Sequence, residues 1–221
     1  MRITNQYPYS EIKRTKGRSG RHYDVGGTRP LPSVTTVLSS MADKTPILEW
    51  RQRVGEQEAN RITKEATSIG NQLHKNLEDY ILEGKAPQGN VLTKILTDLV
   101  IKKGLSKVDE IWGVEVGLYN PELYAGTTDL VGVWQGRPAI MDFKNARNQR
   151  KREWIEDYFF QTVAYGEAHN ELFGTDIRTG VIMMAVRDGT YQEFVIQDQE
   201  YDHYKSKWFD TLYRYYEKFG I

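Results

Sequence analysis

Residues 126–144, GTTDLVGVWQGRPAIMDFK, decide the fold that this chain is expected to adopt. The segment is typical of two β-strands, Thr127–Trp134 and Pro138–Lys144, because apolar residues dominate both halves and a Gln-Gly pair separates them. Gly136 supplies the positive φ angle that a tight turn between antiparallel strands requires. The sequence therefore predicts a β-hairpin around which the rest of the chain is arranged.

Two carboxylates and an ammonium group are expected to converge at the ends of these two strands. Asp129 lies in the first strand, and Asp142 and Lys144 lie in the second. Side chains alternate along a strand, so Asp142 and Lys144 point to the same face. Their neighbours are apolar, and a buried charge is costly unless it is paired or bound to a metal. The pattern predicts an acidic pocket for a hard divalent cation, with a lysine beside it.

Length and charge limit the class of protein. The chain has 221 residues, which suits one large domain, and its 30 basic residues balance 30 acidic ones. This balance of charge argues against a protein whose whole surface binds a polyanion. Residues 1–30 carry seven Lys or Arg against two acids, and residues 144–152 carry five and no acid. Both segments are candidate phosphate-contacting patches, although solvated loop charge explains them as simply.

Cysteine is absent from the sequence. This excludes disulfides, thiolate nucleophiles, cysteine-ligated zinc and iron–sulfur clusters, and it fits a reducing compartment. The sequence has no apolar stretch long enough to span a membrane and no signal-peptide core. We therefore expect an intracellular, cytoplasmic protein.

Residues 1–32 are polar, basic and rich in Gly and Pro. Tyr7–Arg14 and Arg21–Val25 are expected to pair as a hairpin. Aromatic residues alternate with cations here, which suits stacking on nucleic-acid bases beside phosphate contacts. An edge hairpin with amphipathic tyrosines is an equally good interpretation.

Capping residues divide residues 33–104 into helices, with a break expected near residues 67–70. His74 lies beside an apolar helical stripe, and Glu78 follows it by one turn. A lone histidine in such a position is more often packed or exposed than a metal ligand, because no second histidine lies nearby. The expected helix starts are Ser33, Thr45-Pro46 and Asn90, and the expected ends are about Gly84 and Gly104.

The second half of the chain alternates between strands and helices, which predicts an α/β fold with a mixed sheet. Glu115 lies between two valines and faces either the acidic pocket or solvent. Aromatic residues at helical spacing in the final helix are interpreted as a packing stripe rather than a stacking platform for bases. The expected elements are strands at Val108–Leu118, Leu123–Trp134 and Pro138–Lys144, a helix at Glu153–Phe173, strands at Ile177–Arg187 and Tyr191–Ile196, and a helix at Asp198–Phe219.

Five sequence features follow one another along the chain: a histidine on an upstream helix (His74), a glutamate one strand before the next motif (Glu115), Gly126-x-x-Asp129, Asp142-x-Lys144, and Gln161-x-x-x-Tyr165. In this order they resemble the PD-(D/E)XK nuclease superfamily, RecB-like branch. The early SVTTVL segment and the small size are most similar to phage exonucleases and the mitochondrial genome maintenance exonucleases. The resemblance spans roughly residues 33–174, and the order of the features is more specific than any one of them.

The resemblance implies a restriction-endonuclease-like core, with a mixed central sheet flanked by helices and an N-terminal helical addition. The expected organisation is a single nuclease domain over residues 1–221. Its expected parts are a basic arm or hairpin at 1–32, a helical region at 33–104, a catalytic α/β core at 108–196 and a C-terminal helix at 198–219.

The resemblance also implies a metal-dependent DNA exonuclease. It would hydrolyse phosphodiester bonds, from free single-stranded ends, in phage or organelle-type DNA replication, recombination or degradation. The implied cofactor is Mg²⁺ or Mn²⁺, ligated by His74, Asp129, Asp142 and the backbone carbonyl of Phe143. Lys144 would orient or help to deprotonate a water molecule, and Glu115 would join this catalytic group. The implied location of a phage-encoded enzyme is the host cytoplasm.

DNA, single-stranded or with free ends, is the implied partner. Gln161 and Tyr165 either position the substrate or fix the active-site helix by a hydrogen bond. The sequence has no Walker A motif, so a helicase or another replication or recombination protein would have to supply unwinding. No membrane partner is expected. The basic residues expected to hold the DNA backbone are Arg147, Arg150, Lys151 and Arg152.

The missing cysteines are a departure from relatives that hold an iron–sulfur cluster, so no such cluster is expected here. Three other interpretations stay open at this point. The chain could be a catalytically silent module that binds DNA ends, a structure-specific endonuclease, or an interaction protein in which Asp142 and Lys144 form only an ion pair.

Overall fold

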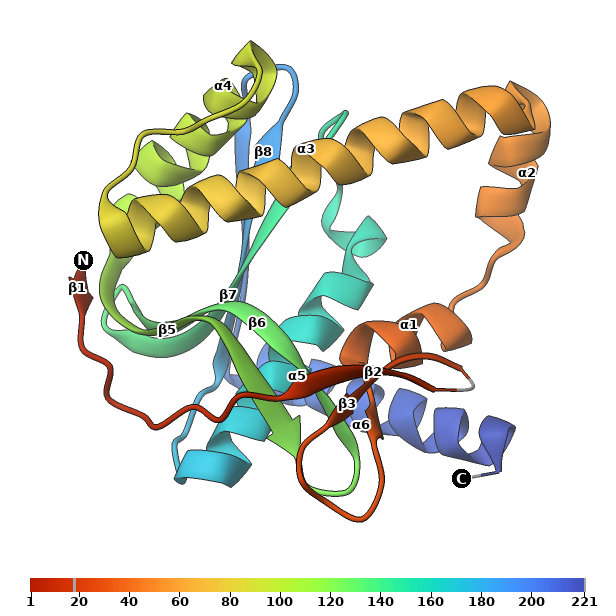
Figure 1. Ribbon diagram of the computed structural model, residues 1–221, viewed down its shortest axis with the longest axis vertical. Helices are drawn as coiled ribbons and strands as arrows, with labels where there is room; N and C mark the ends of the chain where they lie inside the picture. Colours follow the sequence, from red (N-terminus) through yellow and green to blue (C-terminus); the bar gives the residue numbers. More distant parts are fainter. Residues whose placement is uncertain (18, 221) are drawn as a thin grey trace.

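The computed structural model describes residues 1–17 and 19–220, and a six-stranded mixed sheet lies at its centre (Figure 1). β5 to β7 form an antiparallel meander, β8 is parallel to β7, and β9 is antiparallel to β8. The expected α/β class with a mixed sheet is confirmed, and the arrangement is consistent with a PD-(D/E)XK-like core. In spatial order the strands are β1 (Arg2–Ile3), β5 (Val108–Asn120), β6 (Tyr124–Trp134), β7 (Arg137–Ala146), β8 (Thr179–Val186) and β9 (Tyr191–Gln197).

Helices cover both faces of the sheet, and each face has its own apolar core. Side chains alternate along the strands, so Ile140 enters one core and Met141 the other. Both faces of β7 and β8 are therefore buried, which explains their nearly continuous apolar sequences. The first core packs against α1 (Val34–Met41), α5 (Glu156–Phe173) and α6 (Asp198–Phe219), and the second packs against α3 (Glu56–Glu83) and α4 (Val91–Leu99).

Several local predictions are confirmed. Gln135 and Gly136 form the β6–β7 turn with φ angles of 47° and 79°. The Ser33 hydroxyl accepts a hydrogen bond from the Thr36 N–H at the start of α1, and Asn90 caps α4 in the same way. The aromatic stripe of α6 is a packing stripe, since all its members are buried: Tyr201, Tyr204, Trp208, Leu212 and Tyr215.

The expected N-terminal hairpin is present but shorter. It consists of β2 (Lys13–Gly17) and β3 (Gly20–Asp24), which β4 (Leu31–Pro32) extends to three strands. Arg18 in its turn lies outside the described residues.

The first strand of this hairpin does not begin at Tyr7, because Tyr7 and Tyr9 pack onto the core. The Tyr7 ring lies 5.3 Å from Trp112 and 4.8 Å from His169, and the Tyr9 ring lies 5.3 Å from Phe173. The Tyr9 hydroxyl also hydrogen-bonds to His169 Nε2 at 3.0 Å. These contacts support the packing interpretation of the two tyrosines over base stacking.

The expected break near residues 67–70 is wrong, because α3 runs unbroken from Glu56 to Glu83. The chain breaks instead at Gly55, whose φ is 84°, between α3 and α2 (Thr45–Val54). Thr67 lies inside this helix, and its hydroxyl donates a hydrogen bond to the Thr63 carbonyl one turn earlier. Gly70 marks a close approach rather than a break, since a Cβ there would lie 3.2 Å from Asn145 Nδ2.

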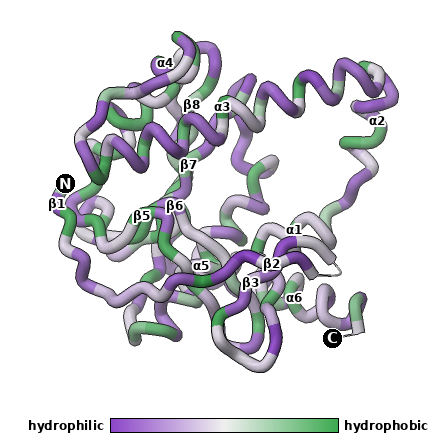
Figure 2. Tube along the Cα trace, viewed as in Figure 1, coloured by the Kyte–Doolittle hydropathy of each residue, from purple (hydrophilic) through white to green (hydrophobic). Residues whose placement is uncertain are grey.

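α2 and the N-terminal part of α3 form an arch that stands away from the sheet (Figure 1). Within the described chain α2 has no buried residue, and α3 has only Ala59 buried before Ile69. Figure 2 shows that this part of α3 is predominantly hydrophilic. Glu65 and Arg187 form an ion pair of 2.6 Å that ties the arch to the end of β8.

Other boundaries also differ from expectation, most of them by one or two residues. α5 begins at Glu156 rather than Glu153, because Arg152–Trp154 forms a separate 3₁₀ turn. β8 begins at Thr179 rather than Ile177, because the Asn170 side chain holds the Ile177 backbone N–H and carbonyl at 2.7 and 3.0 Å. α4 ends at Leu99, and a π-helical turn, Val100–Gly104, and a 3₁₀ turn, Leu105–Lys107, follow it.

Among the described helices, none has the length and apolar content needed to cross a membrane.

Candidate metal centre and catalytic cleft

β6 and β7 separate at the predicted site. Their pairing ends at Leu130 and Met141. Beyond that point the Asp129 carboxylate takes the place of the neighbouring strand, because its Oδ2 accepts a hydrogen bond from the Phe143 N–H at 2.8 Å. The N–H and carbonyl of one strand residue point to the same side, so the Phe143 carbonyl faces the same opening. A carboxylate and a backbone carbonyl are therefore available together.

His74 reaches this opening from α3 and contacts two carboxylates. Its Nδ1 lies 3.3 Å from Asp129 Oδ1 and 3.7 Å from Glu115 Oε1. Ligand atoms of His74, Glu115 and Asp129 all lie within 4.8 Å of one another. The structure thus brings together three of the residues that sequence analysis singled out, from a helix and two strands.

Glu115 is directed to the site by an unusual backbone conformation. Val114 pairs with Leu130 and Val116 with Thr128, so Glu115 lies opposite Asp129 in the β5–β6 register. Its φ is 51°, which is rare for a residue with a long side chain and costs about 1–3 kcal/mol. This resolves the open prediction for Glu115, whose side chain faces the acidic pocket.

Asp142 and Lys144 form a buried pair beside this group. Asp142 is 3% exposed, and its Oδ2 contacts Lys144 Nζ. Lys144 Nζ also donates to Gln161 Oε1 at 3.4 Å. The three-residue cluster includes Glu115 rather than Asp142, so the four expected ligands are not assembled together in this structure.

The charges of the site perturb its pKa values strongly. Burial acts to lower the pKa of His74, but Asp129 and Glu115 outweigh it and raise that pKa to about 10. Burial also acts to raise the pKa of Asp129, but His74 and Lys144 hold it below its usual value. The pKa of Asp142 is raised to about 6 by burial, against the opposing charge of Lys144. The field of these carboxylates favours a cation among them.

The donor set fits a hard divalent cation. Mg²⁺ and Mn²⁺ prefer oxygen ligands, and Mn²⁺ also accepts an imidazole. His74, Glu115 and Asp129 provide such donors. Asp142 Oδ2 is buried beside them and pairs with the Lys144 ammonium.

The cluster lies in a cleft of about 630 Å³ between α3 and the core. Arg14 of β2 and Arg21 of β3 line the opposite wall, and neither forms an ion pair with a described acid. The sequence predicted only a general basic excess in residues 1–30. The two arginines, with Ser33 and Thr35 at the start of α1, are the site residues that sequence analysis did not single out.

Tyr165 explains the glycine of the Gly126-x-x-Asp129 motif. A Cβ on Gly126 would lie 2.6 Å from the Tyr165 hydroxyl oxygen and 2.8 Å from its Cε1. Tyr165 is buried, and with Gln161 it lines the cleft floor from α5. Gln161 Oε1 accepts a hydrogen bond from Lys144 Nζ at 3.4 Å, which joins α5 to the site.

The basic residues between Arg147 and Arg152, which follow β7, are not all exposed to solvent. The side chains of Arg147, Arg150 and Lys151 are exposed. The Arg152 guanidinium instead bonds to Glu200 and to the Val195 carbonyl. Arg152 therefore ties this segment to β9 and α6.

The sequence matches no family model and no curated protein. Two solved structures are similar in part. The protein SSO0001 is 14% identical with a TM-score of 0.41, over 76% of this chain and 69% of its own length. A protein of Eubacterium rectale described as a candidate exonuclease is 13% identical with a TM-score of 0.44, over 66% of this chain and 63% of its own. Likenesses this low establish no shared activity.

Proposed function

We propose that this chain is a metal-dependent DNA exonuclease of the PD-(D/E)XK superfamily, RecB-like branch, which acts on free single-stranded ends. One observation carries the proposal. The His74–Glu115–Asp129 cluster lies where β6 and β7 separate, next to the buried Asp142–Lys144 pair. An ion pair in a purely structural role would not require a histidine and two further acids from other elements around it.

The residues of the site match the demands of phosphodiester hydrolysis. Negative charge develops on the phosphoryl oxygens in the transition state. Lys144 supplies a positive charge there, and its contacts with Asp142 and Gln161 orient it. His74 and Asp129 would hold the metal with the Phe143 carbonyl, Glu115 completes the cluster that the structure assembles, and Asp142 would join it from the neighbouring pair with Lys144. When bound, Mg²⁺ or Mn²⁺ supplies Lewis acidity and a lower pKa for a coordinated water. Glu115 would accept a hydrogen bond from that water.

The walls of the cleft suit a DNA backbone. Arg14 and Arg21 face the cleft from one side, and the exposed Arg147, Arg150 and Lys151 follow β7. Such contacts to phosphate carry no sequence information. α3 lines the cleft from Thr67 to Glu78, and its N-terminal continuation, the arch, leads through α2 back to α1 (Figure 1). A strand that passed beneath the arch would need a free end.

The test is digestion of end-labelled linear single-stranded DNA with Mg²⁺ or Mn²⁺. We expect metal-dependent loss of nucleotides from one end by the wild type, and at least a hundredfold slower digestion by Lys144→Ala and Asp142→Ala. Lys94→Ala, an exposed substitution on α4, is the matched control.

Two outcomes would redirect the proposal. Wild-type protein that retains DNA without cleaving it would favour a silent end-binding module. Cleavage of closed single-stranded circles as fast as linear strands would favour a structure-specific endonuclease.

A further inference from the structure

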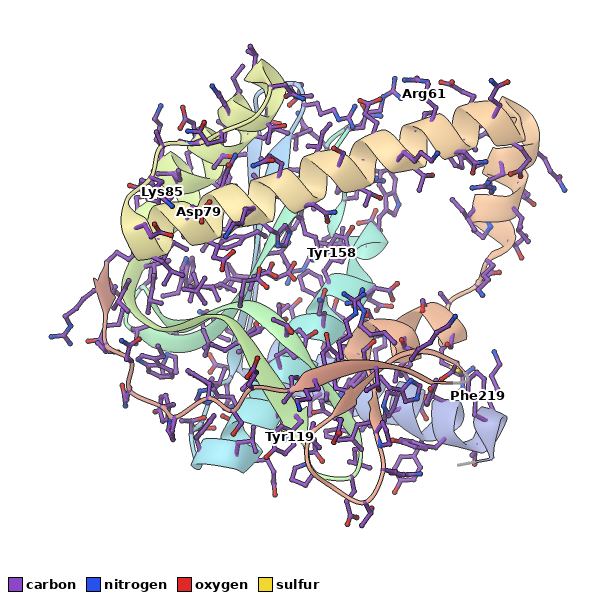
Figure 3. The ribbon with its side chains drawn as sticks, in the orientation of Figure 1. Arg61, Asp79, Lys85, Tyr119, Tyr158 and Phe219 are labelled. Carbon is purple, nitrogen blue, oxygen red and sulfur yellow. The ribbon has the colours of Figure 1, made fainter. Side chains whose placement is uncertain are left out.

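Tyr158, on the first turn of α5, contacts the Lys144 ammonium. Lys144 Nζ lies 4.9 Å from the centre of the Tyr158 ring. At this distance a cation is attracted to the face of an aromatic ring. Figure 3 shows Tyr158 at the N-terminal end of α5, on the side toward α3. Tyr158 lies outside the sequence motifs that predicted Asp142, Lys144 and Gln161.

The ring restrains Lys144 in a way that the other contacts do not. Lys144 ends a flexible four-carbon chain, and its ammonium has three N–H donors. Asp142 takes up one donor at close range, and Gln161 accepts another over a long 3.4 Å. An aromatic face attracts the whole cation without neutralising it, so the ammonium keeps its charge and a donor for a phosphate oxygen.

We propose that Tyr158 is the positioning residue of Lys144, and that its ring holds the ammonium at the opening between β6 and β7. The inference rests on the proposed nuclease function, because it assigns Tyr158 a part in that site. The ring is itself well fixed. The Tyr158 N–H donates to the Ile155 carbonyl at 2.9 Å, and its side chain packs against the core beneath α5.

The contact that defines the role is with the ring, whose centre lies 4.9 Å from Lys144 Nζ. Tyr158→Phe keeps the contact, whereas Tyr158→Leu keeps a similar apolar volume and removes the aromatic face. Tyr213→Leu is the matched control, since Tyr213 is 73% exposed on α6.

The first measurement is steady-state cleavage of linear single-stranded DNA. Loss of a partly buried cation–π contact corresponds to a fall in kcat of about 3- to 30-fold for Tyr158→Leu. KM should stay within about twofold, because the ring acts on Lys144 and not on the bound strand. Tyr158→Phe and Tyr213→Leu should stay within about twofold of the wild type. An equal loss in the Phe and Leu variants would overturn the proposal.

The second measurement does not depend on cleavage. In metal-free protein, the rate at which an amine-reactive reagent labels Lys144 is read by mass spectrometry. The Lys144 side chain is 19% exposed, so removal of the ring should raise this rate several-fold in Tyr158→Leu and leave it unchanged in Tyr158→Phe. Unchanged labelling together with unchanged kcat would overturn the proposal. If the wild type cleaves no DNA, the nuclease proposal fails, while the labelling rate still decides whether Tyr158 holds Lys144.

Discussion

Replacing Gly126 with alanine should destabilise the protein through one identifiable clash. The new Cβ would lie 2.6 Å from the Tyr165 hydroxyl oxygen, 2.8 Å from Cε1 and 3.1 Å from Cζ. Tyr165 cannot swing away freely, because it is only 4% exposed and packs in the core beneath the sheet. Overpacking of this kind costs about 1–3 kcal/mol. For a chain of this length, that cost lowers Tm by about 3–10 °C.

A double-mutant cycle followed by urea and thermal unfolding tests this assignment. Gly126→Ala should cost much less in a Tyr165→Leu background, because the shorter side chain leaves room for the methyl group. Gly27→Ala is the control, since its nearest neighbour would be a Val25 methyl group at 3.9 Å, and it should change stability by less than about 0.5 kcal/mol. An equal cost of Gly126→Ala in both backgrounds would show that Tyr165 is not the reason for the glycine.

Two further predictions concern protons and metal. Burial lowers the pKa of His169 from 6.5 to about 4, so this group adds stability that is complete above pH 6.5 and is lost as the pH falls toward 4. His169→Gln should remove this pH dependence, at most about 3 kcal/mol, from the free energy of unfolding measured in urea. An unchanged slope of the free energy of unfolding against pH would contradict the assignment. Mn²⁺ at about 100 times its Kd should stabilise the wild type by about 2.7 kcal/mol. A thermal shift of the same size in Asp129→Asn would place the metal elsewhere.

The prediction that Asp129 and Asp142 lie on adjacent strands of a hairpin rested on strand alternation and on the cost of buried charge. The structure has Asp129 within β6 and Asp142 within β7 rather than at the strand ends, and Asp142 pairs with Lys144 beside the three-residue cluster. His74 is different, because nothing in its local pattern marked it as a ligand, and only the resemblance to a nuclease family did. The structure places it 3.3 Å from Asp129.

The parts that sequence analysis missed depend on long-range packing. Arg14 and Arg21 reach the cleft only because the β2–β3 hairpin folds back beside β6. The direction of Glu115 depends on a positive φ angle, which a glutamate between two valines does not suggest. The expected break near residues 67–70 is wrong because α3 packs on the sheet from Ile69 onward, and this tertiary packing outweighs the weak helix propensity of the local sequence.

The unbroken course of α3 has a mechanical consequence. His74 and the outer end of the arch belong to a single helix, and the 18 residue-to-residue steps from Glu56 to His74 span about 27 Å. A helix without a break transmits tilt along its length, and the Glu65–Arg187 ion pair holds this helix at a point between the two ends. Tilt of the arch therefore moves the His74 imidazole relative to Asp129 and Glu115, so a load on the arch and the geometry of the candidate site are coupled through one helix.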